Sequence, residues 1–350
     1  MRGLALAAAL LLPAPAGAVR PLTPPAPEFP PNAAWLNSQP FTLKGLRGKR
    51  VVLVAFINTS TANSLRSLKT LNRWWDQYAL KGLLIVGVHA PDFDFDRDPV
   101  VVRDSLKRLG VRFPVMVDSG RRLWRAYENE GWPAFYLVDH KGLIVHDRLG
   151  EGGAQEFEEE LLGALERMNG FRPPASYRVP PDPPRQDCGT ATAPMYLGGR
   201  RGKPIPEISR DQTNAILFSR DGEIAQSGRW QSDMEALRFA GASNADLSAQ
   251  FLVVYQAAEA YAVMGRSGPK PVKVFLRQDN LWLHAGNAGP DVRWDSENRS
   301  YVLVDVPRLY YVTRDPKADA HELRFFPGAR GASFYSLEFS DLCQTAFDHR

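Results

Sequence analysis

The first half of the chain alternates continuous apolar runs with segments whose apolar residues recur every three or four positions. Continuous runs of strand length predict buried strands, and the three- and four-residue spacing predicts helices that bury one face. Strands are predicted at 51–57, 83–88, 113–117, 134–138 and 143–146. Helices are predicted at 65–78, 99–109, 121–127 and 154–168. Helices that alternate with buried strands imply an α/β fold with a central sheet covered on both faces.

Proline-rich segments flank this pattern. Residues 19–34 predict an extended, poorly packed lead-in, and residues 41–49 predict a short strand and turn before the first core strand. Residues 169–187 hold many prolines, which exclude regular structure, and therefore predict a linker. The α/β unit is accordingly expected to occupy residues 35–168.

The second half has short apolar segments punctuated by glycine and proline. Such spacing is typical of an all-β sandwich, which we expect over residues 188–345. Its strands are predicted at 250–255, 258–264, 272–276, 281–284, 301–306, 309–312, 322–326 and 333–339.

The N-terminus has the pattern of a secretory signal peptide over residues 1–18. Arg2 provides a positive charge, Leu4 to Leu12 form an apolar stretch too short to span a bilayer, and Ala16 and Ala18 fit a small-residue cleavage site. The alternative is an uncleaved N-terminal anchor. After cleavage, the protein is expected to be periplasmic or secreted, with no transmembrane segment in the mature chain; with an uncleaved anchor, it would be tethered only by its N-terminus.

The amino-acid composition limits the partners and the reactions that the chain can be expected to have. The net charge of the 350 residues is only +4, and basic residues are dispersed among acidic ones, so no nucleic-acid partner is expected. The two cysteines, Cys188 and Cys343, cannot form a Cys-x-x-Cys motif or a four-ligand zinc site. In an exported protein they favour a structural disulfide, with two buried free thiols as the alternative. We expect no metal and no cofactor.

Several segments together indicate a family. Residues 35–165 resemble the thioredoxin-like (redoxin) domains of the TlpA and DipZ type, and the second half resembles the carbohydrate-binding-like β-sandwich that follows thioredoxin in DipZ proteins. The segments that carry the first resemblance are 35–38, 43–49, 87–89, 91–93, 101–110, 124–127 and 132–134, and those that carry the second are 195–198, 228–230 and 307–310.

The resemblance implies thiol–disulfide exchange, but this chain lacks the residues for it. Thr61 and Ser64 match the positions of the nucleophilic and resolving cysteines, and Ala55 matches the buried acid that assists proton transfer. A hydroxyl does not ionise near neutral pH and forms no disulfide, so neither residue replaces a thiolate. The sequence therefore predicts no catalytic residues for redox chemistry.

One element of the family site remains. Trp132-Pro133 matches the cis-proline loop, which together with Thr61, Ala62, Asn63 and Ser64 outlines a candidate peptide groove. The loop is also part of how this fold packs, so a purely structural role is the alternative.

For the other residues that could take part in catalysis or metal binding, the sequence favours structural roles. Ser64 has no histidine at a spacing that suggests a triad, and His89 is expected to be a satisfied core histidine. The run Asp92, Asp94, Asp96 and Asp98 lacks the pattern of a calcium loop and is expected to be a solvated loop.

Aromatic residues of the second half are candidates for stacking against a glycan. Trp230, Trp282 and Trp294 are the three glycan-binding candidates, with filling of the sandwich core as the alternative for each.

These expectations combine into one hypothesis with one alternative. The hypothesis is an exported, redox-inactive thioredoxin-like protein with a binding or scaffolding role in the cell envelope, towards a peptide, protein or glycan. The alternative is a thiol–disulfide oxidoreductase of the thioredoxin/TlpA type, in which Cys188 and Cys343 would have to carry the electrons.

Overall fold

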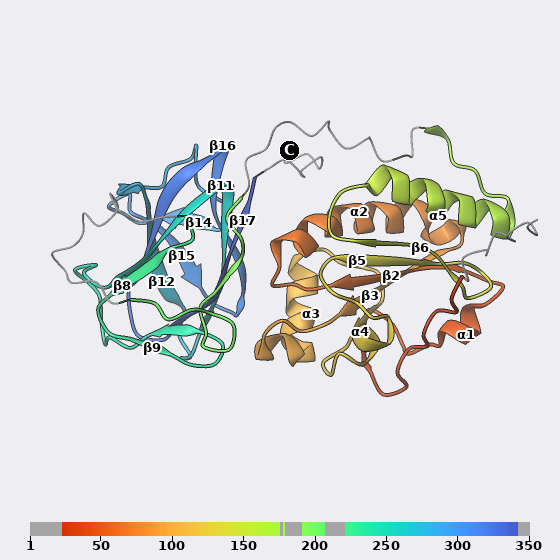
Figure 1. The fold of residues 1–350 in the computed structure, drawn as a ribbon, viewed down its shortest axis with the longest axis horizontal. Helices are drawn as coiled ribbons and strands as arrows, with labels where there is room; N and C mark the ends of the chain where they lie inside the picture. The colour runs from red at the N-terminus through yellow and green to blue at the C-terminus, as the bar shows by residue number, and fades with distance from the viewer. Residues whose placement is uncertain (1–22, 176–177, 179–190, 207–220, 342–350) are drawn as a thin grey trace, which may run out of the picture.

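The computed structural model describes residues 23–175, 178, 191–206 and 221–341 and comprises two layered units (Figure 1). We call residues 23–175 the α/β unit and residues 191–206 with 221–341 the β-sandwich. The predicted signal peptide, Cys188 and Cys343 lie outside the described residues. Among the described residues, none of the helices combines the length and the apolar character that crossing a bilayer requires.

The α/β unit has a central sheet of six strands in the order β1-β4-β3-β2-β5-β6. Strands β2, β3 and β4 run parallel, whereas β1, β5 and β6 pair antiparallel with their neighbours. The strands are β1 (Ala34–Leu36), β2 (Val51–Ile57), β3 (Leu83–His89), β4 (Val115–Val117), β5 (Ala134–Val138) and β6 (Ile144–Leu149). This mixed sheet with helices on both faces is the predicted thioredoxin-like fold.

Helices cover both faces of this sheet, with α2 and α5 above it and α1 and α4 below it in Figure 1. Residues of β2 alternate between the two faces: Leu53 and Ala55 join the core under α2 and α5, while Val54 and Phe56 join the core on the other face. The helices are α1 (Leu43–Leu46), α2 (Ala62–Tyr78), α3 (Pro99–Arg108), α4 (Arg122–Ala126) and α5 (Ala154–Asn169), with short 3-10 turns at Ala79–Lys81 and Asp94–Arg97.

Two expectations for the N-terminal part are wrong. Residues 43–46 form the helix α1 rather than a strand, because Thr42 caps it and the carboxylate of Glu28 accepts the main-chain N–H of Leu43. The lead-in is also not poorly packed from residue 23 onward. Phe29 is only 4% exposed and meets Trp35 edge-on, so this segment completes the lower core of the α/β unit.

The β-sandwich is built from eleven strands joined in one antiparallel sheet, which folds over on itself (Figure 1). The predicted all-β architecture is therefore confirmed. The strands are β7 (Met195–Tyr196), β8 (Ile224–Ser227), β9 (Trp230–Ser232), β10 (Leu237–Phe239), β11 (Gln250–Arg266), β12 (Val272–Gln278), β13 (Leu281–Trp282), β14 (Val292–Trp294), β15 (Ser300–Val304), β16 (Arg308–Pro327) and β17 (Ala332–Ser340).

Two pairs of predicted short strands are each one long strand. β11 includes both 250–255 and 258–264, and β16 includes both 309–312 and 322–326. The pairing of β11 with β16 shifts register from Ala257 opposite Asp319 to Glu259 opposite Arg314. This irregularity interrupts the sequence pattern without ending either strand, which is why the pattern predicts four strands.

The two units pack against each other along a surface that we call the seam. Ala62 and Phe93 of the α/β unit contact an apolar cluster of the β-sandwich, formed by Ala236, Tyr261, Val263, Leu309 and Tyr335. Ala62 is 3% exposed and Phe93 is 2% exposed, so the seam buries the residues at the start of α2.

Candidate functional site

Two loops meet at one end of the central sheet, where the resemblance places the redox site. The antiparallel pairing of β2 with β5 sets Phe56 opposite Ala134, so the loop that leaves β2 lies beside the loop that enters β5. The first of these loops leads into Thr61, the N-cap residue of α2, and the second contains a cis peptide bond between Trp132 and Pro133.

A buried polar network holds the loop between β2 and α2. Ser64 Oγ accepts the main-chain N–H of Asn58 at 3.1 Å, and the side chain of Asn58 accepts the N–H of Ser60 at 2.6 Å. The Asp96 carboxylate accepts the Ser60 hydroxyl at 2.8 Å and the Asn58 amide at 3.2 Å. Burial raises the pKa of Asp96 to about 6. These bonds give the loop one conformation and use the hydroxyl of Ser64 as an acceptor.

His89 lies beneath the same loop and is fully buried, as expected for a core histidine. Its Nε2 accepts the main-chain N–H of Thr59 at 3.2 Å, but its Nδ1 has no hydrogen-bond partner among the described residues. Burial lowers the pKa of His89 to about 4, so the ring is neutral near pH 7. The expected satisfied histidine is thus satisfied at one nitrogen only.

The β-sandwich caps the first turn of α2. Thr61 makes no side-chain cap hydrogen bond, and its Oγ1 is buried without a partner among the described residues. Instead, the main-chain N–H of Ala62 donates to Oε2 of Glu338 on β17 at 2.8 Å. The carboxyl oxygen of Glu338 thus satisfies one of the free amides at this end of the helix. Glu338 therefore occupies the place where a redox thiolate would be stabilised.

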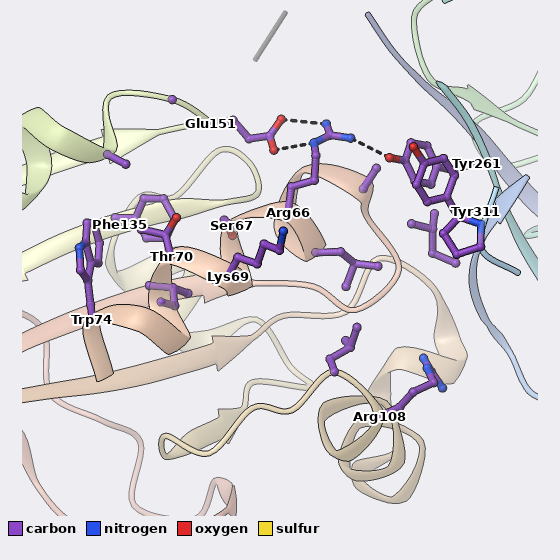
Figure 2. A pocket seen from close by; sticks show the side chains of 18 of the residues that line it. Arg66, Ser67, Lys69, Thr70, Trp74, Arg108, Phe135, Glu151, Tyr261 and Tyr311 are labelled. Carbon is purple, nitrogen blue, oxygen red and sulfur yellow. Dashed lines mark hydrogen bonds and ion pairs between the residues drawn. The ribbon is translucent and has the colours of Figure 1, made fainter. Parts of the chain in front are cut away.

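Arg66, one turn further along α2, links both units (Figure 2). It forms two 2.8 Å hydrogen bonds with Glu151 of the α/β unit, and it reaches Tyr261 Oη at 3.3 Å and Glu259 at 3.6 Å on β11. Burial alone would lower the pKa of Arg66, but the hydrogen bond and charge of Glu151 raise it. The guanidinium is therefore charged and fastens α2 to the sandwich.

The acidic run after β3 is a second contact point between the units and is only in part the solvated loop that the sequence suggests, because Asp94 and Asp98 are exposed. Asp92 pairs with Arg201 of the sandwich at 2.6 Å, and Phe93 packs on Tyr335 with ring centroids 5.2 Å apart. Asp96 is 1% exposed, while Asp98 accepts from the N–H of Val100 at the start of α3. Asp92 and Phe93 of this run thus contact the sandwich, whereas Asp98 caps α3. Among the described residues, no group of three or more metal-ligating side chains occurs.

The candidate peptide groove is mostly buried, and at Ala62 the seam covers it. Ala62, Ser64 and Pro133 are buried, Thr61 and Trp132 are half-buried, and only Asn63 is exposed. Ala55 is fully buried under α2. Trp132 lies beside Trp124, and the guanidinium of Arg121 stands 4.9 Å from both ring centroids. The structure thus gathers the predicted site residues at one sheet end but leaves little of them accessible.

The three glycan-binding candidates are not gathered into one platform. Trp230 packs against Phe239, Phe251 and Phe334 inside the sandwich, which favours a core role. Trp282 is half-buried beneath Arg277, whose guanidinium lies 4.1 Å from its ring. Trp294 is 42% exposed and is held by a hydrogen bond from its Nε1 to the carbonyl of Leu283. Trp294 is therefore the most accessible of the three, whereas Trp230 and Trp282 are both half-buried.

Comparisons with known proteins identify the family. The model of the AhpC/TSA family matches residues 23–147. The thiol-disulfide oxidoreductase YkuV of Bacillus subtilis is 31% identical over 144 residues, which are 41% of this chain and 96% of YkuV. The chain belongs to the AhpC/TSA family of thioredoxin-like proteins.

A longer match extends beyond the α/β unit into the second half of the chain. Protein DipZ of Mycobacterium bovis is 31% identical over 257 residues, which are 69% of this chain and 35% of DipZ. The chain thus spans about a third of the length of DipZ. The solution structure of a thioredoxin-like protein in the oxidized form is 30% identical, with a TM-score of 0.39 over 42% of this chain and 99% of that one.

Proposed function

We propose that this thioredoxin-like protein is exported, does not exchange disulfides and has a binding role in the cell envelope. One observation carries the proposal: the positions of the redox pair are Thr61 and Ser64, and Glu338 of the β-sandwich is seated on the helix amide between them. A disulfide substrate would find neither a thiolate nor a free helix N-terminus there.

The proposal divides the mature chain as the sequence suggests. Residues 35–168 form the thioredoxin-like domain, 169–187 the linker and 188–345 the β-sandwich domain, after a signal peptide at 1–18. The seam supports a scaffolding role for the thioredoxin-like domain, because Arg66 and Asp92 form ion pairs with Glu259 and Arg201 of the β-sandwich domain. A peptide cannot reach the groove at Thr61 without displacing the sandwich, so the ligand site is expected along the seam.

The second candidate function is thiol–disulfide exchange. It is favoured by the similarity to YkuV, which is a thiol-disulfide oxidoreductase. In this chain it would require electrons to pass through Cys188 and Cys343, which are far from α2 in sequence. The redox-inactive proposal is favoured by the residues at the start of α2, because Thr61 and Ser64 have hydroxyls where a redox pair would have thiols.

The deciding experiment is dithiothreitol-driven reduction of insulin by the mature protein, beside the variant Cys188→Ala/Cys343→Ala. We expect both proteins to give the uncatalysed background rate, because no thiolate forms at the helix N-terminus. A rate that exceeds background and disappears in the double variant would overturn the proposal and support the second candidate function.

A further inference from the structure

A cavity of about 440 Å³ lies on the seam, beside α2 (Figure 2). Its size falls within the range of about 300–1,000 Å³ that is usual for small-molecule sites. One wall comes from α2 and α5 of the α/β unit, and the opposite wall comes from β11 and β16 of the sandwich. The cavity therefore depends on the contact between the two units.

Apolar side chains line both walls and are only partly covered by the protein. Leu65 and Leu109 are half-buried on the α/β side, and Tyr311 is half-buried on the sandwich side. Water in the cavity would lie against these apolar surfaces, which is unfavourable. An apolar molecule that replaced this water would gain free energy in proportion to the area that it covers.

Three aromatic side chains of the walls are held in place by hydrogen bonds. Trp74 donates from Nε1 to Glu158 at 2.8 Å, and the hydroxyls of Tyr261 and Tyr311 both donate to Glu259. The rings of Tyr261 and Tyr311 also stack, with centroids 4.3 Å apart. These contacts fix the rings before a ligand arrives, and fixed rings favour a ligand that is itself aromatic.

The charged side chains around the cavity are paired with one another or exposed to water. Arg66 pairs with Glu151 at 2.8 Å and Arg308 with Asp291 at 2.7 Å, while Arg148 lies 3.7 Å from a glutamate at the start of α5. Two further basic residues that line the cavity are exposed, which lets their charged ends stay hydrated: Lys69 and Arg108. A charged ligand would therefore lose its own hydration without completing an ion pair.

We propose that this cavity binds a neutral molecule with an aromatic ring system, held between α2 and the wall formed by β11 and β16. The inference rests on the proposed binding role and names its ligand class. The fixed rings and apolar walls match the ring system, and the paired charges match its neutrality. Because both units supply walls, the ligand also stabilises their contact.

The test is a fluorescence titration of the mature protein with N-phenyl-1-naphthylamine, a neutral probe that becomes fluorescent in apolar surroundings. We expect saturable binding of one molecule per chain. The comparison probe is 1-anilinonaphthalene-8-sulfonate, which has the same rings and a sulfonate. It should bind at least about tenfold more weakly, because its charge would have to leave water.

The variant Leu109→Trp fills part of the cavity from the end of α3. We expect it to weaken binding of the neutral probe at least about tenfold, because the indole takes up apolar area that the probe would cover. The matched control is Leu80→Trp, at a side chain that is 96% exposed and does not line the cavity, and it should leave the affinity within about twofold. Should Leu109→Trp fail to fold, Pro290→Trp adds the same ring from the sandwich side, with the same expected loss.

Three outcomes would overturn the proposal. They are an absence of saturable binding of the neutral probe, equal affinity for the two probes, and unchanged affinity in the folded filling variant.

These outcomes are independent of the insulin experiment. Reduction of insulin together with binding of the neutral probe would remove the redox-inactive proposal and leave the ligand site. Absence of both would leave the redox-inactive proposal and remove the ligand site.

Discussion

Replacing Arg66 by methionine should lower the free energy of unfolding by about 3–5 kcal/mol. The side chain of Arg66 is 13% exposed, and those of Glu151 and Glu259 are 7% and 0% exposed. Removing the guanidinium leaves two carboxylates in a poorly solvated seam without their common cation. Methionine retains most of the apolar stem, so the loss reports chiefly the charge.

Urea unfolding followed by tryptophan fluorescence measures this effect. The matched control is Arg112→Met, because Arg112 pairs with Asp76 at an exposed site where the two side chains are 62% and 51% exposed. That control should cost less than about 1 kcal/mol. If Arg66→Met and Arg112→Met were equally stable, Arg66 would not be the fastening that joins the two units.

Replacing Glu338 by glutamine should change how stability depends on pH. Glu338 is half-buried as a residue, and burial of its carboxyl group in the seam raises its pKa to about 7 from the usual 4.5. The effects of neighbouring groups on this pKa partly cancel. Asp92 and Glu151 raise the pKa of Glu338, whereas Arg66 and the Ala62 N–H lower it. Glutamine keeps the acceptor oxygen for Ala62 and removes the charge.

The direction in which stability changes with pH follows from proton binding by Glu338. An acid whose pKa is raised in the folded state holds its proton more tightly there than in the unfolded chain, so its contribution is present below pH 4.5 and is lost as pH rises through 7. Glu338→Gln lacks this loss. It should match the parent protein at pH 4.5 and be more stable by about 1–3 kcal/mol at pH 8.

Chemical unfolding of both proteins between pH 4 and 8 tests this prediction. Asp96 and His89 also titrate in this window, but they are present in both proteins, so the difference between the two curves isolates Glu338. Glu130→Gln, at an exposed glutamate, is the control for the substitution itself and should change the free energy of unfolding by less than about 0.5 kcal/mol. A variant that loses stability at pH 8 would mean that the ionised carboxylate, not the neutral one, is favoured at the seam.

The sequence predicts the α/β unit well because its strands are buried on both faces and its helices are amphipathic. Both features leave a local pattern, as in residues 51–57 and 154–168. The helix α1 and the buried Phe29 were missed because their causes lie elsewhere in the chain: the Glu28 carboxylate caps α1 from 15 residues away. A proline-rich segment can also pack tightly without regular structure.

The loop residues of the candidate site were located from sequence, but its surroundings were not. Thr61, Ser64 and Pro133 were found through the resemblance to thioredoxin-like domains, whose redox pair and cis-proline loop they match. The cap on Ala62 comes from Glu338, 276 residues away, and the cavity needs walls from both units. No local pattern encodes such contacts. The one available signal was the alternation of Asp92 to Asp98 with phenylalanines, which the structure explains by the seam.

The central claim is that the β-sandwich covers the position of the redox pair, and thiol accessibility tests it most directly. Thr61→Cys and Asn63→Cys, each in the Cys188→Ala/Cys343→Ala background, would be labelled with a maleimide under native conditions. Because Oγ1 of Thr61 is buried and Asn63 is exposed, the thiol at position 63 should react at least about tenfold faster. Equal labelling rates would contradict the account, because they would show the helix N-terminus open to substrate.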